Sequence, residues 1–116
     1  MFTMPALERR QFPRVTVHLP AIYRSTNLTS DGFVLNLSQG GLGLTCEALD
    51  TEGTEAEVQI TLPGHPESMR LRGQVVWARR SNGSEQAVMG IRFGALSRKQ
   101  RVALANFLIA RCCSTS

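Results

Sequence analysis

Long apolar runs are absent from this sequence of 116 residues, and none approaches the roughly 20 residues of a membrane-spanning helix. The first ten residues, M-F-T-M-P-A-L-E-R-R, also lack the apolar centre of a signal peptide. We therefore expect a cytoplasmic protein without a membrane span.

Cysteine and histidine are scarce as well. The three cysteines, Cys46, Cys112 and Cys113, are odd in number and form no C-x-x-C motif, so neither a disulfide framework nor a zinc site is predicted. His18 and His65 stand apart from any cluster of metal ligands. We expect no metal and no resident cofactor. Motifs of nucleophilic, zinc-hydrolytic and P-loop catalysis are also missing, so we expect a binding protein and not an enzyme.

The composition is that of an ordinary globular protein with a modest positive charge. Apolar residues make up 42% and charged residues 19%, and the net charge of +4 favours anionic partners. This length suggests a single domain over residues 1–116. Within it we expect a flexible basic arm at 1–14, a barrel at 15–93 and a helix at 97–112.

Six short segments have strand character, and turn residues separate them. They are residues 15–23, 33–37, 42–46, 55–62, 69–80 and 86–93. Connections this short exclude parallel βαβ units. The pattern predicts a mainly β fold, an antiparallel sheet closed into a barrel or folded as a sandwich. Pro20 predicts a sheet edge or a bulge within the first strand, and Asp31-Gly32 predicts a hairpin turn.

The C-terminal segment changes to helical periodicity. Ser97 and Gln100 have the spacing of a capping box. One apolar stripe comprises Leu104, Phe107 and Leu108, and a second comprises Val102, Ala105, Ile109 and Cys112. The second stripe predicts either a helix seated in a broad groove, which we favour, or an outer face that meets a partner.

A basic segment, E-R-R-Q-F-P-R-V at 8–15, precedes the first strand. Pro13 disfavours a helix here, so Arg10 and Arg14 stand about 13 Å apart in an extended chain. Guanidinium groups match phosphate oxygens and the guanine edge, and they also stack on bases. Taken alone, the segment favours a solvated arm over an anion site.

A second polar segment, N-L-S-Q-G-G at 36–41, ends the second strand. Asn36 and Ser38 carry short hydrogen-bonding side chains, while Gly40 and Gly41 permit positive φ and close approach of a ligand to the backbone. Taken alone, this is a tight turn whose polar side chains cap their own backbone.

Together, Arg10-x-x-x-Arg14 and Asn36-x-Ser38-x-x-Gly41 resemble the paired signature of the PilZ domain family. The stretches G-Q-V-V-W-A-R (73–79) and M-G-I-R-F (89–93) are also similar to the family's later strands. The resemblance implies a six-stranded antiparallel split barrel with a C-terminal helix. It also implies a bacterial cyclic di-GMP receptor that acts as an adaptor for an effector protein in motility, chemotaxis or exopolysaccharide and biofilm formation.

The resemblance also implies roles for individual residues. Arg10 and Arg14 would bind phosphate and guanine, Asn36 and Ser38 would hydrogen-bond the ligand, and Gly41 would let the backbone approach. An arginine before the motif goes with two stacked ligand molecules in this family, so Arg9 predicts a second molecule. Trp77, the only tryptophan, has two interpretations, a ligand-stacking residue or a core residue.

Two alternatives to this function remain open. A nucleic-acid-binding barrel would use a basic surface extended by Arg70, Arg72, Arg79, Arg80 and Arg92, although we expect no DNA partner. A PilZ-like module that binds no nucleotide usually lacks the arginine motif, which this sequence keeps.

Overall fold

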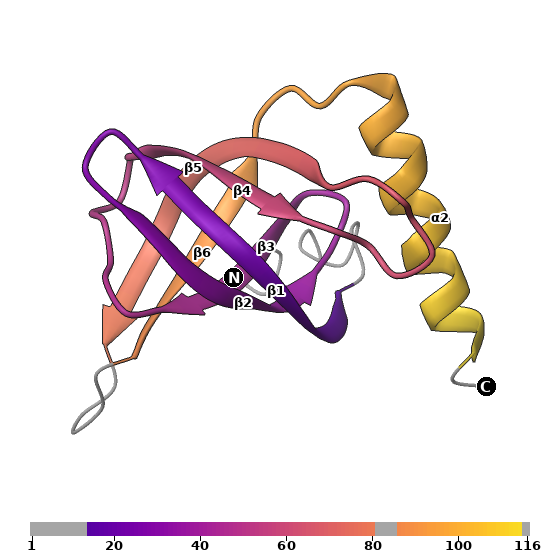
Figure 1. Cartoon of the computed structure of the whole chain (residues 1–116), viewed down its shortest axis with the longest axis horizontal. Coiled ribbons are helices and arrows are strands. Elements are labelled where there is room, and N and C mark those ends of the chain that lie inside the picture. The colour runs from indigo at the N-terminus through magenta and orange to yellow at the C-terminus, as the bar shows by residue number, and fades with distance from the viewer. Residues whose placement is uncertain (1–13, 81–85, 115–116) are drawn as a thin grey trace, which may run out of the picture.

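The computed structural model describes residues 14–80 and 86–114. Its elements are β1 (Val15–Ser25), β2 (Thr29–Leu37), β3 (Gly41–Cys46), β4 (Glu55–Ile60), β5 (Met69–Arg80), β6 (Ala87–Phe93) and α2 (Arg98–Ser114). The strands form a closed barrel in the order β1-β2-β3-β6-β5-β4, and every neighbouring pair is antiparallel (Figure 1). The predicted six-stranded antiparallel barrel with a C-terminal helix is therefore confirmed.

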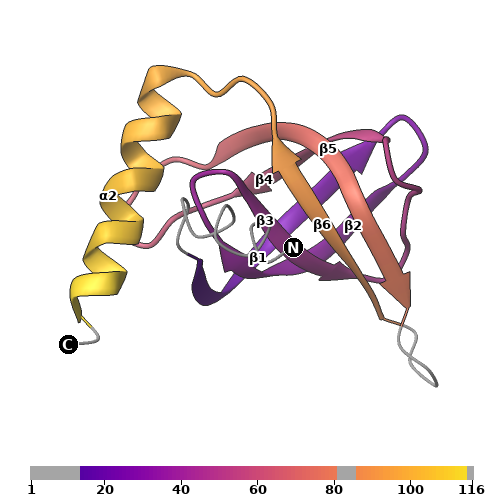
Figure 2. The same ribbon diagram turned by 180° about the vertical axis from the view of Figure 1, so that it is seen from behind.

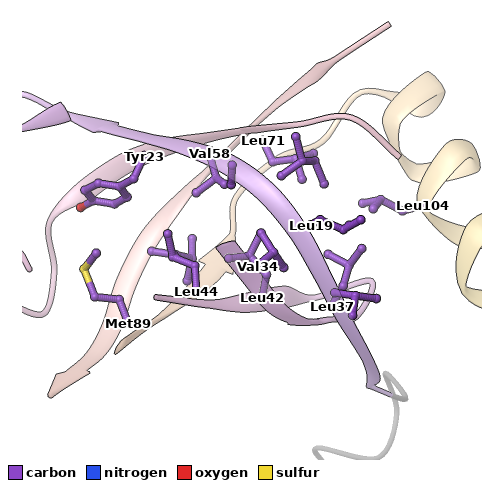
Figure 3. Close-up of a cluster of buried hydrophobic side chains, with 14 of the residues drawn as sticks. Leu19, Tyr23, Val34, Leu37, Leu42, Leu44, Val58, Leu71, Met89 and Leu104 are labelled. Carbon is purple, nitrogen blue, oxygen red and sulfur yellow. The ribbon is translucent and has the colours of Figure 1, made fainter. Parts of the chain in front are cut away.

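The barrel closes because one side of each strand is apolar. In β1 the side chains of Val17, Leu19, Ala21 and Tyr23 are buried and alternate with exposed or partly exposed residues. Residues of the other five strands fill the same interior, as Figure 3 shows for Val34, Leu44, Val58, Leu71 and Met89. The alternation of apolar and polar residues thus divides the barrel into an apolar interior and an outer wall open to ligands.

Two local predictions for the first hairpin have different outcomes. Pro20 pairs with Phe33 of β2, but pairing with β4 begins only at Ala21, so proline lies where one side of β1 has no ladder partner. The prediction of a turn at Asp31-Gly32 is wrong. Both residues lie inside β2 without positive φ, and the chain turns earlier, where the Ser25 amide donates to the carbonyl of Leu28 at 2.8 Å.

Helix α2 lies at one end of the barrel (Figures 1 and 2). Its start has the predicted capping box, because Gln100 N donates to Ser97 Oγ and Ser97 N donates to Gln100 Oε1, both at 3.1 Å. Ala103, Leu104 and Leu108 are buried, and Leu104 points toward Leu19 (Figure 3).

The prediction that a groove of the barrel covers the second apolar stripe of α2 is wrong. Val102 and Ile109 are 50% and 61% exposed, while Ala105 is partly buried, and the side chain of Cys112 lies outside the described part. The helix touches the barrel with one face only, because Leu104 and its neighbours already cover the end of the core. None of the described residues form a helix with the length and apolar character that crossing a bilayer requires.

A buried carboxylate fixes the loop between β3 and β4 to the first hairpin. Asp50 accepts hydrogen bonds from the Tyr23 hydroxyl at 2.6 Å, from Ser25 Oγ at 2.7 Å and from Asn27 Nδ2 at 3.2 Å. Burial opposes the charge of Asp50, but these hydrogen bonds outweigh it and lower the carboxyl pKa. Burial and the hydrogen bond to Asp50 raise the pKa of Tyr23.

Candidate functional site

Arg14, the last residue of the first motif, meets Asn36 of the second motif on the outer wall of the barrel. Arg14 directly precedes β1, and Asn36 lies near the end of β2, opposite Thr16. Arg14 Nη1 donates a hydrogen bond to Asn36 Oδ1 at 3.2 Å. The antiparallel β1–β2 pair thus brings together residues that are 22 positions apart in the sequence.

Ser38 organises the tight turn between β2 and β3. Its hydroxyl accepts hydrogen bonds from the amides of Gly40 and Gly41 and donates to the carbonyl of Gly41, each at 3.2 Å. The Ser38 amide donates to the same carbonyl at 2.9 Å. One donor and two acceptor positions use the full capacity of a hydroxyl. A direct bond from Ser38 to a ligand, which stays a prediction, would require giving up one of these contacts.

Gly41 is constrained by its neighbours and not by its backbone angle. Neither Gly40 nor Gly41 uses the positive φ that glycine permits. A Cβ atom at Gly41 would instead overlap the carbonyl oxygen of Ile91 on β6. Glycine is therefore required here by the approach of a neighbouring strand, and its predicted role toward a ligand remains untested.

A row of register partners crosses the outer wall from β2 to β5. Asn36 pairs with Gly43, Gly43 pairs with Gly90, and Gly90 pairs with Trp77. The ladder is irregular directly before both ends of the row, between Val34 and Asn36 and between Val75 and Trp77. Bulges of this kind redirect side chains near binding sites.

The two central glycines of this row lie beneath the side chains at its ends. A Cβ at Gly43 would come within 2.9 Å of Asn36 Nδ2, and a Cβ at Gly90 would overlap the indole of Trp77. Asn36 therefore lies over Gly43 of β3, and Trp77 lies over Gly90 of β6, so the two glycines form the floor beneath these side chains. Three strand spacings, or about 14 Å along the curved wall, separate their backbones.

Trp77 lies outside the barrel core. The indole is partly exposed on the outer wall, and the guanidinium of Arg79 lies 5.2 Å from its ring centroid. This cation–π contact helps to hold the ring in place. Of the two interpretations of Trp77, burial in the barrel interior is therefore excluded, and one part of the indole is available for stacking.

A hollow of about 430 Å³ has both Arg14 and Trp77 in its lining. That volume falls in the range of small-molecule pockets, roughly 300–1,000 Å³. Its lining residues are Arg14, Ser38, Gly40, Gly41, Leu42, Val76, Trp77, Gly90, Ile91, Arg92 and Phe93. Arg14 and Arg92 are the charged members of this lining, so the hollow attracts anions.

The structure thus brings Arg14, Ser38, Gly41 and Trp77 to one hollow, and Asn36 is joined to this group by its hydrogen bond to Arg14. Arg9 and Arg10, together with most of the predicted N-terminal arm, lie outside the described residues.

Sequence reasoning did not assign Gly43 or Gly90 to this site, and it named Arg92 only for the nucleic-acid alternative. Glycine at an outward position of a strand, as in L-G-L (42–44) and M-G-I (89–91), signals close approach of another group and could have identified the floor.

The arginines of the nucleic-acid alternative are divided among different contacts. Arg70 and Arg72 lie near Glu57, Arg79 lies over Trp77, and Arg80 donates to the carbonyl of Glu47. Arg92 lines the hollow beside Arg14. The described arginines of β5 and β6 therefore do not form one continuous basic stripe.

The chain belongs to the PilZ domain family, whose model matches residues 8–110. No curated protein matches the sequence significantly.

Solved structures share the fold. The Bacillus subtilis inhibitor of motility MotI superimposes with a TM-score of 0.79 and 20% identity, over 93% of this chain and 53% of MotI. This chain thus spans about half the length of MotI.

Two further structures are single PilZ domains of similar length. The PilZ domain of Escherichia coli YcgR, solved with cyclic di-GMP, has a TM-score of 0.72 and 15% identity, over 92% of this chain and 94% of that domain. The PilZ domain of CeSA from a cellulose-synthesizing bacterium has a TM-score of 0.60 and 16% identity, over 84% and 96% respectively.

Proposed function

We propose that this chain is a cyclic di-GMP receptor that passes the signal to an effector protein. The observation that carries the proposal is the hydrogen bond between Arg14 and Asn36 beside a cationic, glycine-floored hollow that Trp77 also lines. Membership of the PilZ family and the similarity to a YcgR domain solved with cyclic di-GMP support it.

The chemistry of the hollow suits a cyclic dinucleotide, which combines two phosphates with two guanine bases. Arg14 offers several N–H donors beyond the one used by Asn36, and Arg92 adds a second guanidinium. These groups match phosphate oxygens and the O6/N7 edge of guanine. The exposed part of the Trp77 indole offers a surface on which guanine stacks.

Asn36 has two roles in this proposal. It orients Arg14 in the free protein, and its amide faces the hydrogen-bonding edge of guanine in the complex. Ser38 and Gly41 shape the turn on which the ligand rests, so their effect on affinity is largely geometric.

Arg9 and Arg10 complete the proposal from outside the described residues. We assign Arg10 to the same phosphate and guanine groups as Arg14, and Arg9 to a second, stacked molecule of cyclic di-GMP. In this proposal the bound ligand holds residues 1–14 against the barrel wall and so creates the surface that an effector of motility, chemotaxis or exopolysaccharide synthesis recognises.

Isothermal titration calorimetry with cyclic di-GMP tests both affinity and stoichiometry. The proposal predicts a dissociation constant in the micromolar range or tighter, about 8 kcal/mol or more of binding free energy. Two molecules per chain in the wild type and one in Arg9→Ala are expected. Absence of binding heat at ligand concentrations well above micromolar would contradict the receptor function.

A further inference from the structure

Three arginines surround one carboxylate on a part of the barrel wall that does not line the hollow. Glu57 on β4 lies opposite Arg24 of β1 and Arg72 of β5 in the strand register. Its carboxylate is 3.6 Å from Arg24 Nη1, 3.9 Å from Arg70 Nε and 3.9 Å from Arg72 Nε. Glu55 lines the same surface as Arg24, Glu57 and Arg72, so the three arginines and two glutamates leave one positive charge uncompensated.

Glu57 lies within ion-pair distance of the Nε atoms of both Arg70 and Arg72. The Nε atom of Arg70 lies nearest one carboxylate oxygen, and the Nε atom of Arg72 lies nearest the other. The side chain of Glu57 is only 21% exposed, whereas those of Arg70 and Arg72 are 66% and 84% exposed. The terminal Nη groups of both arginines are thus left largely to solvent.

The backbone beneath these two arginines is tied to the segment leading into α2. The carbonyl of Arg70 accepts a hydrogen bond from Gln100 Nε2 at 2.8 Å, and the carbonyl of Arg72 accepts one from the amide of Gly94 at 2.9 Å. Pairing of β5 with β6 starts only at Gly73. The start of β5 is therefore a fixed platform, and the β4–β5 connection runs beside α2 in both views (Figures 1 and 2).

The first turn of α2 adds to the positive potential of this region. It contains no acidic residue, and Arg98 and Lys99 are exposed there. Cations at a helix N-terminus oppose the helix dipole, so they do not stabilise the helix electrostatically. The bond from Gln100 to Arg70 brings this turn beside the start of β5, within a Debye length of about 8–10 Å.

We propose that Arg24, Arg70 and Arg72, held around Glu57, form a docking surface for an acidic segment of a partner protein. Arg70 and Arg72 lie two positions apart on the same side of β5, as alternate residues of a strand do. Their guanidiniums match carboxylates two positions apart on an extended peptide, each in a charge-assisted pair. This surface does not depend on cyclic di-GMP binding in the hollow.

Acidic protein fits the surface better than nucleic acid does. Glu55 and Glu57 stand among the arginines, so the surface has charges of both signs and lacks the continuous basic stripe that follows a phosphate backbone. Single-stranded nucleic acid also needs aromatic groups for stacking. The exposed large apolar side chains of the described residues, Phe33, Val76, Val102 and Ile109, belong to other parts of the wall or to α2.

The test uses the full chain without cyclic di-GMP and a fluorescein-labelled peptide of alternating glutamate and serine, twelve residues long. Fluorescence anisotropy is measured for the wild type, for Arg70→Gln/Arg72→Gln and for Arg79→Gln/Arg80→Gln. The last variant loses the same charge at the other end of β5. A peptide with glutamine in place of glutamate, a single-stranded oligonucleotide and vesicles containing phosphatidylglycerol serve as competing ligands.

The expected result is saturable binding of the acidic peptide that weakens about tenfold in Arg70→Gln/Arg72→Gln and less than twofold in the matched variant. Binding should decrease in high salt and should be lost with the glutamine peptide. Equal weakening in both double variants would reduce the effect to net charge and overturn the proposal. Tighter binding of the oligonucleotide or the vesicles, with the same dependence on Arg70 and Arg72, would also overturn it. Cyclic di-GMP titrations of the wild type and of Arg70→Gln/Arg72→Gln show separately whether the receptor function holds.

Discussion

Arg14 and Asn36 lie 22 positions apart and are joined by a 3.2 Å hydrogen bond on the outer wall of the barrel. This bond pre-orients one arginine of the signature before any ligand arrives, and pre-orientation reduces the entropy that binding must overcome. We therefore expect Arg14→Ala and Asn36→Ala to be non-additive. In a double-mutant cycle on cyclic di-GMP affinity, the coupling should be about 0.5–3 kcal/mol. Strictly additive losses would show that the two residues act independently.

Gly90 is expected to control the position of Trp77. A Cβ at Gly90 would overlap the indole, so Gly90→Ala should displace the ring and shift the fluorescence maximum of this single tryptophan. Overpacking of this kind should cost roughly 1–3 kcal/mol in the free energy of unfolding, and cyclic di-GMP affinity should fall.

Gly94→Ala is the matched control for Gly90→Ala. A Cβ at Gly94 would have as its nearest neighbour the carbonyl oxygen of Arg72, at an ordinary 3.9 Å. An unchanged tryptophan spectrum in Gly90→Ala would contradict the proposed floor.

Asp50 should make the stability of the barrel depend on pH. Its pKa is lowered in the folded state, so its contribution is complete above the unfolded value of about 3.9 and is lost as pH falls through the folded pKa. Urea unfolding at neutral and acidic pH should show this loss in the wild type and a smaller loss in Asp50→Asn.

Tyr23 should make the stability of the barrel depend on pH in the opposite direction. Its raised pKa means that stability should fall as pH rises beyond the unfolded value of about 10. Asp50→Ala leaves the buried Tyr23 hydroxyl without this acceptor and should cost about 1–3 kcal/mol in the free energy of unfolding. Tyr23→Phe should cost less, because Asp50 keeps Ser25 and Asn27 as donors. A larger loss in Tyr23→Phe than in Asp50→Ala would contradict this reading of the network.

Ser97→Ala should destabilise α2 by about 1 kcal/mol, because it removes the acceptor for the Gln100 amide. Ser97→Asp keeps an acceptor and should restore most of that stability. Thermal unfolding followed by circular dichroism compares the two variants. Equal melting temperatures for Ser97→Ala and the wild type would mean that the capping box contributes nothing to stability.

The regular parts of the fold could be predicted from local sequence patterns. Alternation in β1 and β4 and the Ser97–Gln100 capping box depend on neighbouring residues, and all three are present. The turn predicted at Asp31-Gly32 is wrong because an Asp-Gly pair can also lie inside a strand. At Gly32 the constraint is the nearby carbonyl of Thr45 on β3, which only the sheet register reveals.

The candidate site, like the fold, could be predicted from sequence only where it depends on local motifs. Local motifs identified Arg14, Asn36 and Ser38, whereas the floor made by Gly43 and Gly90 depends on pairing between β2, β3, β6 and β5. The face of α2 that carries Ile109 was misassigned for a related reason. Helical periodicity shows that a second apolar stripe exists, but only the packed barrel shows how much of it is covered.

Intrinsic fluorescence of Trp77 during titration with cyclic di-GMP, in the wild type and in Arg14→Ala, tests the receptor account most directly. The sequence contains one tryptophan, and it lines the proposed site. We predict a saturable change in the wild type in the micromolar range or tighter, and at least tenfold weaker binding in Arg14→Ala, since a charge-assisted hydrogen bond contributes about 1.5–3 kcal/mol. An identical response in both proteins, or no response in the wild type, would contradict the proposed function.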